Sequence, residues 1–566
     1  MKDQKVIKSA FYIISLCGIV VLASLMSFRS GTIAGFDLWF HMGRIQSIGT
    51  EILNQQFPVR YETEGWYGYG YVSTSFYGNI FLYPVALLYN MGLPVYRCYN
   101  IYAILINLVT ALIAYYSFKR VFGEERWGLM GSLVYTFAAY RIANVYMQDT
   151  VGEYTAQAFL PLVFYGFYRI YTSSDEKRDW RDTIRLILPL VLGVSGVLES
   201  HILTTEILAM FVVIFAVVNL PQTIRKLKEL LISLAAIVGL NAFFLIPFLD
   251  SYTGNDLYIT SSSTVEDLTK YGNYIIQLLK PFITGDGDVS EWSAANEGYI
   301  GSGVTIIVSL VLFVVVAIIK KKQTNKYAAQ VFALGLVAAW VSTVYFPWSW
   351  FAGDNAISKL ISAVQYPTRY MLMMSVCLAF AGVYAMKELL QDRPMKWFLG
   401  SFVALGMCCV VMMGIFDYTL VCHVKTVANV DADEPYSDNL YLPTGTDRGL
   451  LTDTSILVDS PDLQVEYYGH YNGNRKYMAT NSSADLQTVQ LPVLLYKNIH
   501  AYLEDGSELS CQRGDNNRIM IQVPGGYHGI ITISFVVPTL WHVAEIITLL
   551  TIVILLVGGL WRKQNG

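Results

Sequence analysis

Three polar side chains that can carry charge or exchange protons lie close together near the start of the sequence. Asp37, His41 and Arg44 stand in the segment GFDLWFHMGRI at positions i, i+4 and i+7, so on a helix they form one polar stripe beside an aromatic face. The stripe begins shortly beyond the end of a long apolar stretch. A carboxylate at such a boundary is placed to act on a substrate with a lipid tail and a polar head. The alternative is a helix on the membrane surface whose polar groups face water, and the residues leave both open.

Two further pairs of ionisable residues stand between apolar stretches. Asp149 and Glu153 are four residues apart and face the same way on a helix, where they can hold a divalent cation or contact an acceptor. An exposed acidic loop explains this spacing equally. Glu199 and His201 stand in a short polar group, where a buried carboxylate needs a partner or a function. A helix cap or a loop contact is the alternative interpretation of this second pair.

A third candidate is an arginine at the beginning of another apolar stretch. Arg369 follows Gln365 in the segment QYPTR. A guanidinium can hold a phosphate through two parallel hydrogen bonds, and Gln365 would contact the substrate beside it. An arginine that extends from the membrane edge into water is the alternative.

The segment 65 to 83 interleaves aromatic residues with glycine and hydroxyl residues. Trp66, Tyr67 and Tyr69 are the candidates here, because aromatic faces stack on sugar rings while glycines allow close approach of the backbone. An aromatic belt at the membrane surface accounts for the same composition.

The composition indicates the elements that position these residues. Of 566 residues, 54% are hydrophobic and only 14% are charged, with a formal net charge of -4. Soluble domains carry about 25% charged residues, so a water-soluble enzyme is excluded and a polytopic, mainly α-helical membrane protein is predicted. No basic run suggests binding to nucleic acid. Seven cysteines without a CxxC pair argue against a zinc or redox motif.

Twelve stretches are long and apolar enough, or nearly so, to span a bilayer. They cover residues 9 to 28, 96 to 118, 127 to 143, 154 to 172, 185 to 200, 201 to 219, 230 to 250, 301 to 319, 327 to 346, 366 to 387, 396 to 416 and 539 to 561. The first is too long for a signal peptide and is expected to be an uncleaved anchor.

The distribution of lysine and arginine predicts the orientation. With the N-terminus inside, every basic cluster in the short loops falls on the cytoplasmic side, and both termini are cytoplasmic. The apolar segment 76 to 92 contains Pro84 and is expected to lie on the outer surface or re-enter, because a further span would turn all these clusters outward.

Three regions are then expected outside the cell: 29 to 95, 251 to 300 and 417 to 538. The last has strand-like runs separated by turn residues and predicts a small β domain, which residues 539 to 566 anchor to the membrane domain 1 to 416. Cys422 and Cys511 both fall in it and could form a disulfide in an oxidising exterior.

Several motifs resemble those of one superfamily. The acidic residue Asp37 followed by FHMGRI after the first span, the QYPTR segment, and the runs LPVLLYKNIHAYLEDG and VPGGYHGIITISF before the last helix resemble the GT-C superfamily of polyprenyl-phosphate-dependent glycosyltransferases. The resemblance is greatest to the bacterial YfhO-like and 6-pyruvoyl-tetrahydropterin-synthase-related membrane proteins. QYPTR departs from the QFPWR motif of that family at Tyr366 and Thr368.

The resemblance implies a function and assigns roles to the candidates. A sugar would pass from a polyprenyl phosphate to a polymer or lipid of the cell envelope, such as a teichoic acid, on the outer face of the cell membrane. Asp37 would be the catalytic base of an inverting transfer. Arg369, helped by Arg44 or His41, would hold the donor phosphate. No cofactor is certain, and a divalent cation at Asp149 and Glu153 is one option.

Two other functions stay open. A transporter or flippase of lipid-linked sugars commonly has twelve spans, but it is expected to have ionisable residues deep within spans and broken helices in both halves. A non-catalytic envelope-assembly protein would tolerate the loss of Asp37.

Overall fold

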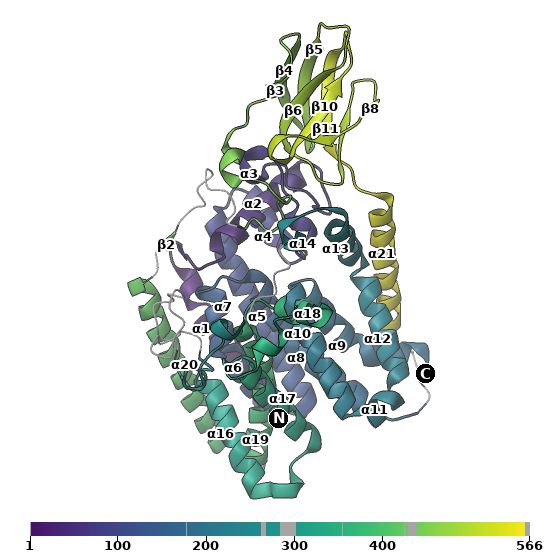
Figure 1. The fold of residues 1–566 in the computed structure, drawn as a ribbon. Coiled ribbons are helices and arrows are strands. Elements are labelled where there is room, and N and C mark those ends of the chain that lie inside the picture. Colours follow the sequence, from purple (N-terminus) through teal and green to yellow (C-terminus); the bar gives the residue numbers. More distant parts are fainter. Residues whose placement is uncertain are drawn as a thin grey trace.

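The computed structural model of the chain describes residues 2–176, 178–261, 268–282, 301–353, 355–423, 426–427 and 438–560. A helical body carries a β domain at one end, and the last helix, α21, descends from that domain beside α12 and α13 (Figure 1). The α-helices are α1 (Lys2–Ala23), α2 (Leu38–Leu53), α3 (Gly65–Gly68), α4 (Tyr83–Asn90), α5 (Val95–Phe122), α6 (Glu125–Thr136), α7 (Ala139–Tyr146), α8 (Val151–Tyr171), α9 (Trp180–Leu198), α10 (Ile202–Val218), α11 (Leu220–Arg225), α12 (Leu227–Leu240), α13 (Ala242–Gly254), α14 (Tyr258–Ser261), α15 (Ile275–Leu278), α16 (Val304–Lys320), α17 (Lys326–Val341), α18 (Ala356–Ser362), α19 (Met371–Leu390), α20 (Met395–His423) and α21 (Thr539–Leu560).

Several of these helices are suited to a membrane. Within the described residues, α5, α19, α20 and α21 are each long and apolar enough to cross one, and α12 with α13 would make a fifth crossing that bends by 71°. Part of α1, together with α10, α16 and α17, is apolar but shorter. With the composition, these helices identify an integral membrane protein.

The predicted apolar stretches all fall on helices, but two of them are interrupted. The stretch 127 to 143 is divided between α6 and α7, and 230 to 250 contains the bend between α12 and α13. The apolar composition of these two stretches predicts helices, but it does not show where a helix is interrupted. The count of twelve crossings and the orientation stay predictions.

The segment 76 to 92 contains the eight-residue helix α4, which packs against α2 and α5. At about 1.5 Å per residue, α4 is far too short to span a bilayer. The length of α4 agrees with the prediction that the segment 76 to 92 does not cross the membrane.

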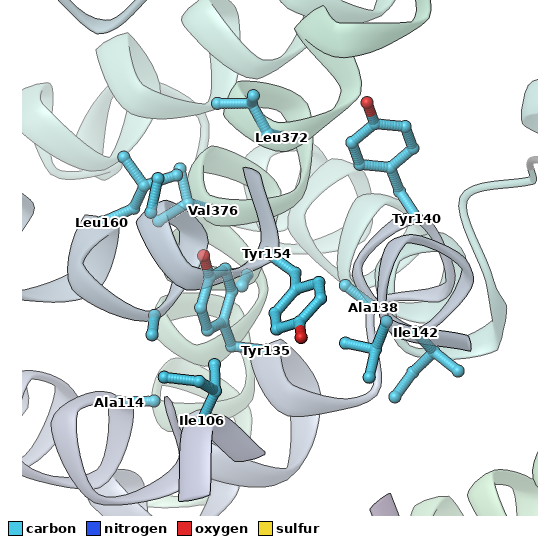
Figure 2. Packing of buried hydrophobic residues seen from close by; sticks show 14 of the residues in the cluster. Ile106, Ala114, Tyr135, Ala138, Tyr140, Ile142, Tyr154, Leu160, Leu372 and Val376 are labelled. Atoms are coloured by element: carbon cyan, nitrogen blue, oxygen red, sulfur yellow. The ribbon is translucent and has the colours of Figure 1, made fainter. Parts of the chain in front are cut away.

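The main core joins the helices that carry the candidate residues. Figure 2 shows buried side chains of α5, α6, α8 and α19 that meet there: Ile106, Ala114, Tyr135, Tyr154, Leu160, Leu372 and Val376. Close packing of this kind fixes α8 relative to α19. Glu153 lies in the first turn of α8, and Arg369 lies just before α19.

The segment before α2 is tied to the end of α20. Strand β1 (Thr32–Ile33) pairs antiparallel with β2 (Thr426–Val427), and Arg29 forms an ion pair with Asp417 at 2.6 Å. The start of α2, where Asp37 lies, is therefore held by residues almost 400 positions later in the sequence.

The C-terminal β domain that the sequence predicted is present, and it consists of two antiparallel sheets. Their strands are β3 (Leu457–Val458), β4 (Leu463–Tyr471), β5 (Asn474–Asn481), β6 (Gln487–Leu494), β7 (Ile499–Tyr502), β8 (Glu508–Leu509), β9 (Gln512–Arg513), β10 (Arg518–Val523) and β11 (His528–Phe535). The orders are β3-β6-β10-β9 and β4-β5-β11-β7-β8. Burial alternates along β5, as expected for a sheet with one face in a core.

The turns between these strands follow their sequence signals. Gly506, between β7 and β8, and Gly526, between β10 and β11, have φ values of +86° and +71°, which favour glycine. Cys511 has a free thiol, and the side chain of Cys422 lies outside the described residues.

Candidate active site

Asp37 stands at the beginning of α2, where its backbone N–H donates to the carbonyl of Gln148 at 3.0 Å. Two residues earlier, the N–H of Gly35 donates to Oδ2 of Asp149 at 2.6 Å. A Cβ at position 35 would lie 2.3 Å from that oxygen, so only glycine permits this approach. The two contacts hold the segment carrying Asp37 against residues 147 to 149.

The side chain of Asp149 holds this segment in place. It is fully buried, and its other carboxylate oxygen, Oδ1, accepts a hydrogen bond from the hydroxyl of Tyr99 at 2.7 Å. Burial raises the pKa of Asp149 to about 7, and the two hydrogen bonds oppose this shift. Both oxygens are thus in use within the protein.

Glu153 and Arg369 form a buried ion pair that joins α8 to the residues before α19. Nε of Arg369 lies 3.4 Å from Oε2 of Glu153. Oε1 of Glu153 accepts hydrogen bonds from the hydroxyl of Tyr140 at 2.5 Å and from Nδ2 of Asn144 at 3.0 Å, both on α7. Because Glu153 is satisfied on both oxygens, it serves as a fixed counter-charge that orients Arg369.

A second nitrogen of the Arg369 guanidinium, Nη1, is also held within the protein. Nη1 donates to Oε1 of Gln365 at 2.9 Å and to the carbonyl of Val364 at 3.0 Å. The ring of Tyr366 lies 5.5 Å from the guanidinium carbon. Among the described residues, nothing accepts a hydrogen bond from Nη2, which leaves this nitrogen for an oxyanion.

Asp37 is half-buried and lies within the field of these groups. Burial raises the pKa of Asp37 to about 6, the charge of Arg369 opposes the shift, and the carboxylates of Asp438 and Glu153 add to it. The structure therefore brings three of the predicted candidates, Asp37, Arg369 and Glu153, to one place.

Asp438 is a member of this group that the sequence did not indicate. It lies in the segment that leads into the β domain, about 400 residues after Asp37. Its Oδ1 accepts a hydrogen bond from the N–H of Leu440 at 2.8 Å, and burial raises the pKa of Asp438 to about 6. No motif surrounds it, so only the folded structure brings it to the site.

His41 and Arg44 do lie on one face of α2 with Asp37, but this face meets protein rather than water. Nη2 of Arg44 donates to Oδ1 of Asn79 at 2.7 Å, Nη1 lies 3.3 Å from Nδ1 of His41, and the ring of Tyr77 lies 4.4 Å from the guanidinium carbon. Burial and the charge of Arg44 lower the pKa of His41, so this imidazole is neutral. Neither side chain is accessible to a phosphate in this structure.

Glu199 and His201 form the turn between α9 and α10 that the sequence predicted. Gly152 in α8 lies so close to this turn that a Cβ there would be 3.1 Å from Cδ2 of His201, which places His201 beside the turn of α8 that carries Glu153. Nδ1 of His201 pairs with the hydroxyl of Thr204 at 2.8 Å. Glu199 is 5% exposed, and neither of its side-chain oxygens has a hydrogen-bond partner among the described residues.

The aromatic candidates in the segment 65 to 83 mostly support the β domain. Trp66 and Tyr69 are 3% and 0% exposed and belong to the core of that domain, and the carbonyl of Tyr69 accepts a hydrogen bond from the N–H of Leu494 in β6. Their side chains are not available to a sugar. Tyr67 is exposed, and its φ of +57° is unusual for a tyrosine.

The described residues contain no group of three or more His, Cys, Asp or Glu side chains arranged to hold a metal ion. A divalent cation at Asp149 and Glu153 stays a prediction from the sequence, and both side chains are engaged in the contacts given above.

An apolar cavity of about 490 Å³ lies between α8, α10, α17 and α19. Its wall on α19 includes Met373, one turn after Arg369, and continues through Phe380 to Tyr384. Phe211 on α10 and Ala328 on α17 line the other side. Met373 is the lining residue of α19 nearest to Arg369, and the other lining residues of this helix, from Phe380 to Glu388, lie toward its opposite end.

No protein-family model matches the sequence. An uncharacterized protein of Lactococcus lactis subsp. cremoris (strain MG1363) is 21% identical over 600 residues, which cover 97% of this chain and 94% of that protein.

Two solved structures show partial similarity. Arabinofuranosyltransferase AftD from Mycobacteria is 10% identical with a TM-score of 0.42, over 73% of this chain and 27% of that chain. ArnT from Cupriavidus metallidurans, bound to undecaprenyl phosphate, is 11% identical with a TM-score of 0.27, over 67% of this chain and 78% of that chain. Similarities at this level do not establish a common function.

Proposed function

We propose that the protein is a membrane glycosyltransferase that moves a sugar from a polyprenyl phosphate to an acceptor of the cell envelope. The observation that carries this proposal is the place of Arg369. The charge of its guanidinium opposes the raised pKa of Asp37, one of its nitrogens has no partner among the described residues, and Arg369 precedes a helix that lines an apolar cavity. Asp37 is the candidate base, Arg369 the candidate cation for the phosphate, and the cavity the candidate site for an apolar tail.

The chemistry requires each of these parts. An acceptor hydroxyl attacks the anomeric carbon of the donor, its proton passes to the carboxylate of Asp37, and the bond between that carbon and the phosphate oxygen breaks. The phosphate leaves with the bonding electron pair, so it needs positive charge and no proton. Arg369 supplies that charge, oriented by Glu153 on one side and Gln365 on the other. Attack opposite the leaving group inverts the anomeric centre.

The donor tail has a place in this arrangement. A polyprenyl chain is apolar, and the cavity beside α19 is lined by side chains such as Met373, Phe211 and Phe380. Transfer of apolar surface from water into such a cavity contributes about 25 cal/mol per Å². We therefore assign the phosphate to Arg369 and the first isoprene units to this cavity.

The test is sugar transfer by the full-length protein in liposomes. Wild type, Asp37→Asn and the control Asp459→Asn, an exposed residue of the β domain, are supplied with labelled polyprenyl-phosphate sugars and the surface-polymer fraction of the source cell. We expect transfer by the wild type and the control, and a loss of about 10²-fold to 10⁴-fold in Asp37→Asn. Full transfer by a folded Asp37→Asn protein would remove Asp37 as the base.

Transport of lipid-linked sugars is the second candidate, because two predicted spans are broken. The bend of 71° between α12 and α13 and the division between α6 and α7 are features that transporters use at their binding sites. If no donor gives transfer with the wild type, protection of the labelled lipid from an external hydrolase will show whether the protein moves it across the bilayer.

A further inference from the structure

Two buried tyrosine hydroxyls donate to successive turns of α8 from neighbouring helices. Tyr135 on α6 donates to the backbone carbonyl of Gln157 at 2.6 Å, and Tyr140 on α7 donates to Oε1 of Glu153 at 2.5 Å. Both tyrosines are 1% exposed (Figure 2). They differ in what they hold, because Tyr135 binds the helix backbone whereas Tyr140 binds a carboxylate that is itself paired with a cation.

The carboxylate of Glu153 connects α7 to Arg369. Its Oε1 accepts hydrogen bonds from Tyr140 and from Nδ2 of Asn144, and its Oε2 lies 3.4 Å from Nε of Arg369. Burial raises the pKa of Glu153, whereas the charge of Arg369 and the hydrogen bonds from α7 oppose this shift and favour the ionised form. Because two donors fix Oε1, the plane of the carboxylate is fixed and Oε2 faces Arg369 in one direction.

Helix α7 is itself held by α5 and α1. Nη2 of Arg141 donates to Oδ1 of Asn107 on α5 at 2.7 Å, and the hydroxyl of Tyr146 donates to the carbonyl of Ala23 on α1 at 2.7 Å. These contacts lie on both sides of Asn144 and directly after Tyr140 in the sequence. The hydroxyl of Tyr140 therefore comes from a helix that is fixed to the body of the protein.

We propose that Tyr140 is a positioning residue of the donor-phosphate site, which acts through Glu153 to aim the guanidinium of Arg369 at the phosphate. The inference rests on the proposed function, because it takes the phosphate of the donor to bind at Arg369. It brings α7 into the site, although no residue of this helix stands among the candidates from the sequence.

Arg369 needs this support because its fork must point in one direction. Nε faces Glu153, Nη1 donates to Gln365 and to the carbonyl of Val364, and Nη2 has no partner among the described residues. A guanidinium is planar, so fixing Nε and Nη1 also fixes the direction of Nη2. Removal of the Tyr140 hydroxyl leaves Oε1 of the carboxylate with one donor. The carboxylate is then free to turn, and Nη2 loses its fixed direction.

The test is a double-mutant cycle on the binding of undecaprenyl phosphate, a lipid phosphate without a sugar. Full-length protein in nanodiscs is exposed to increasing amounts of this lipid as wild type, Tyr140→Phe, Arg369→Lys and the double variant. We expect Kd to rise about tenfold in each single variant, because each loses a hydrogen bond of a charged group. Since Tyr140 acts through Arg369, the double variant should also show a rise of about tenfold, and not the rise of about a hundredfold that two independent effects would give.

Tyr135→Phe is the matched control. It removes the same hydroxyl from an equally buried hydrogen bond to α8, but the partner is a backbone carbonyl and not the carboxylate beside Arg369. Tm should fall by a similar amount in Tyr135→Phe and Tyr140→Phe, whereas Kd should stay at the wild-type value in Tyr135→Phe. Asn144→Leu removes the second donor to Oε1 and keeps the size of the side chain, so it should raise Kd as Tyr140→Phe does. It replaces Tyr140→Phe in the cycle if that variant does not fold.

The outcomes separate this inference from the proposed function. An unchanged Kd in folded Tyr140→Phe, an equal rise of Kd in Tyr135→Phe, or effects of Tyr140→Phe and Arg369→Lys that multiply would each overturn the positioning role. If the wild type binds the lipid but transfers no sugar, the proposed function fails and the cycle still decides the role of Tyr140. If the wild type binds no undecaprenyl phosphate, the phosphate site at Arg369 is wrong and the inference is overturned with it.

Discussion

The backbone N–H of Gly35 donates to Oδ2 of Asp149 at 2.6 Å, and this contact fixes the segment that carries Asp37. Asp149 reaches it because its own backbone has a φ of +54°, a left-handed conformation that aspartate tolerates better than most residues. A carboxylate that the sequence suggested as a metal ligand is thus an anchor for the candidate base.

Gly35→Ala should abolish most of the activity. The new Cβ would lie 2.3 Å from Oδ2 of Asp149, so the segment must move away and take Asp37 with it. A displacement of about 1 Å at a catalytic group can cost about 10²-fold in rate. The matched control is Gly18→Ala in α1, where a Cβ has nothing within 4 Å. Transfer rates of both variants in liposomes check the prediction, and a wild-type rate in Gly35→Ala contradicts it.

The rate of transfer should fall in acid because Asp37 must be ionised to accept a proton. Since burial raises the pKa of Asp37 to about 6, kcat/KM should be half-maximal near pH 6 and fall about tenfold for each pH unit below it. An ordinary aspartate would keep its activity to about pH 4. The pH profile of the wild type measures this limb, and activity that is unchanged at pH 5 would exclude Asp37 as a base with a raised pKa.

Asp149 should make the protein less stable as the pH rises. Its pKa is raised from 3.8 to about 7, so the folded state favours the protonated form. This contribution is fully present below about pH 4 and is lost as the pH rises through 7, with a magnitude on the order of 4 kcal/mol. Asp149→Asn resembles the protonated form, so its Tm relative to the wild type should increase between pH 4 and 8. A difference in Tm that does not vary with pH would contradict this.

The sequence indicates which residues are candidates for the site, but it does not show what surrounds them. Short motifs in the sequence indicate Asp37 and Arg369, and in the structure the charge of Arg369 acts on the pKa of Asp37. The polar stripe of Asp37, His41 and Arg44 exists, but periodicity does not tell whether a stripe faces water or protein, and here it is buried under Asn79 and Tyr77. Asp438 could not be predicted, because its place depends on how the β domain packs.

The β domain gives a second example of this limit. Its strands and turns follow local residue patterns, so they were predictable. Its core, however, takes in Trp66 and Tyr69 from a region almost 400 residues earlier. Alternation of aromatic residues and glycine in the sequence suits sugar binding and packing equally well, and only the structure distinguishes the two for these side chains.

Arg369→Lys should weaken donor binding more than it slows the chemical step. Lysine keeps the positive charge beside Glu153, but it lacks the fork that donates to Gln365 and leaves Nη2 for a phosphate. We expect KM for the donor to rise about tenfold, equivalent to about 1.4 kcal/mol. Arg393→Gln, at an exposed position, is the control. An unchanged KM in Arg369→Lys would place the phosphate elsewhere.

Ala328→Trp should reduce the affinity for donors with long tails and spare those with short tails. Ala328 lines the apolar cavity between α17 and α19, and an indole there would occupy space that we assign to the isoprene units. The neighbouring Ala329 is exposed on the same helix, so Ala329→Trp adds the same side chain outside the cavity. For a long-chain donor, KM should rise about tenfold in Ala328→Trp and stay unchanged in Ala329→Trp. For a donor with only two isoprene units, both variants should match the wild type, because such a tail would not reach Ala328. Equal effects of the two substitutions would mean that the tail lies along the lipid-facing surface and not in the cavity.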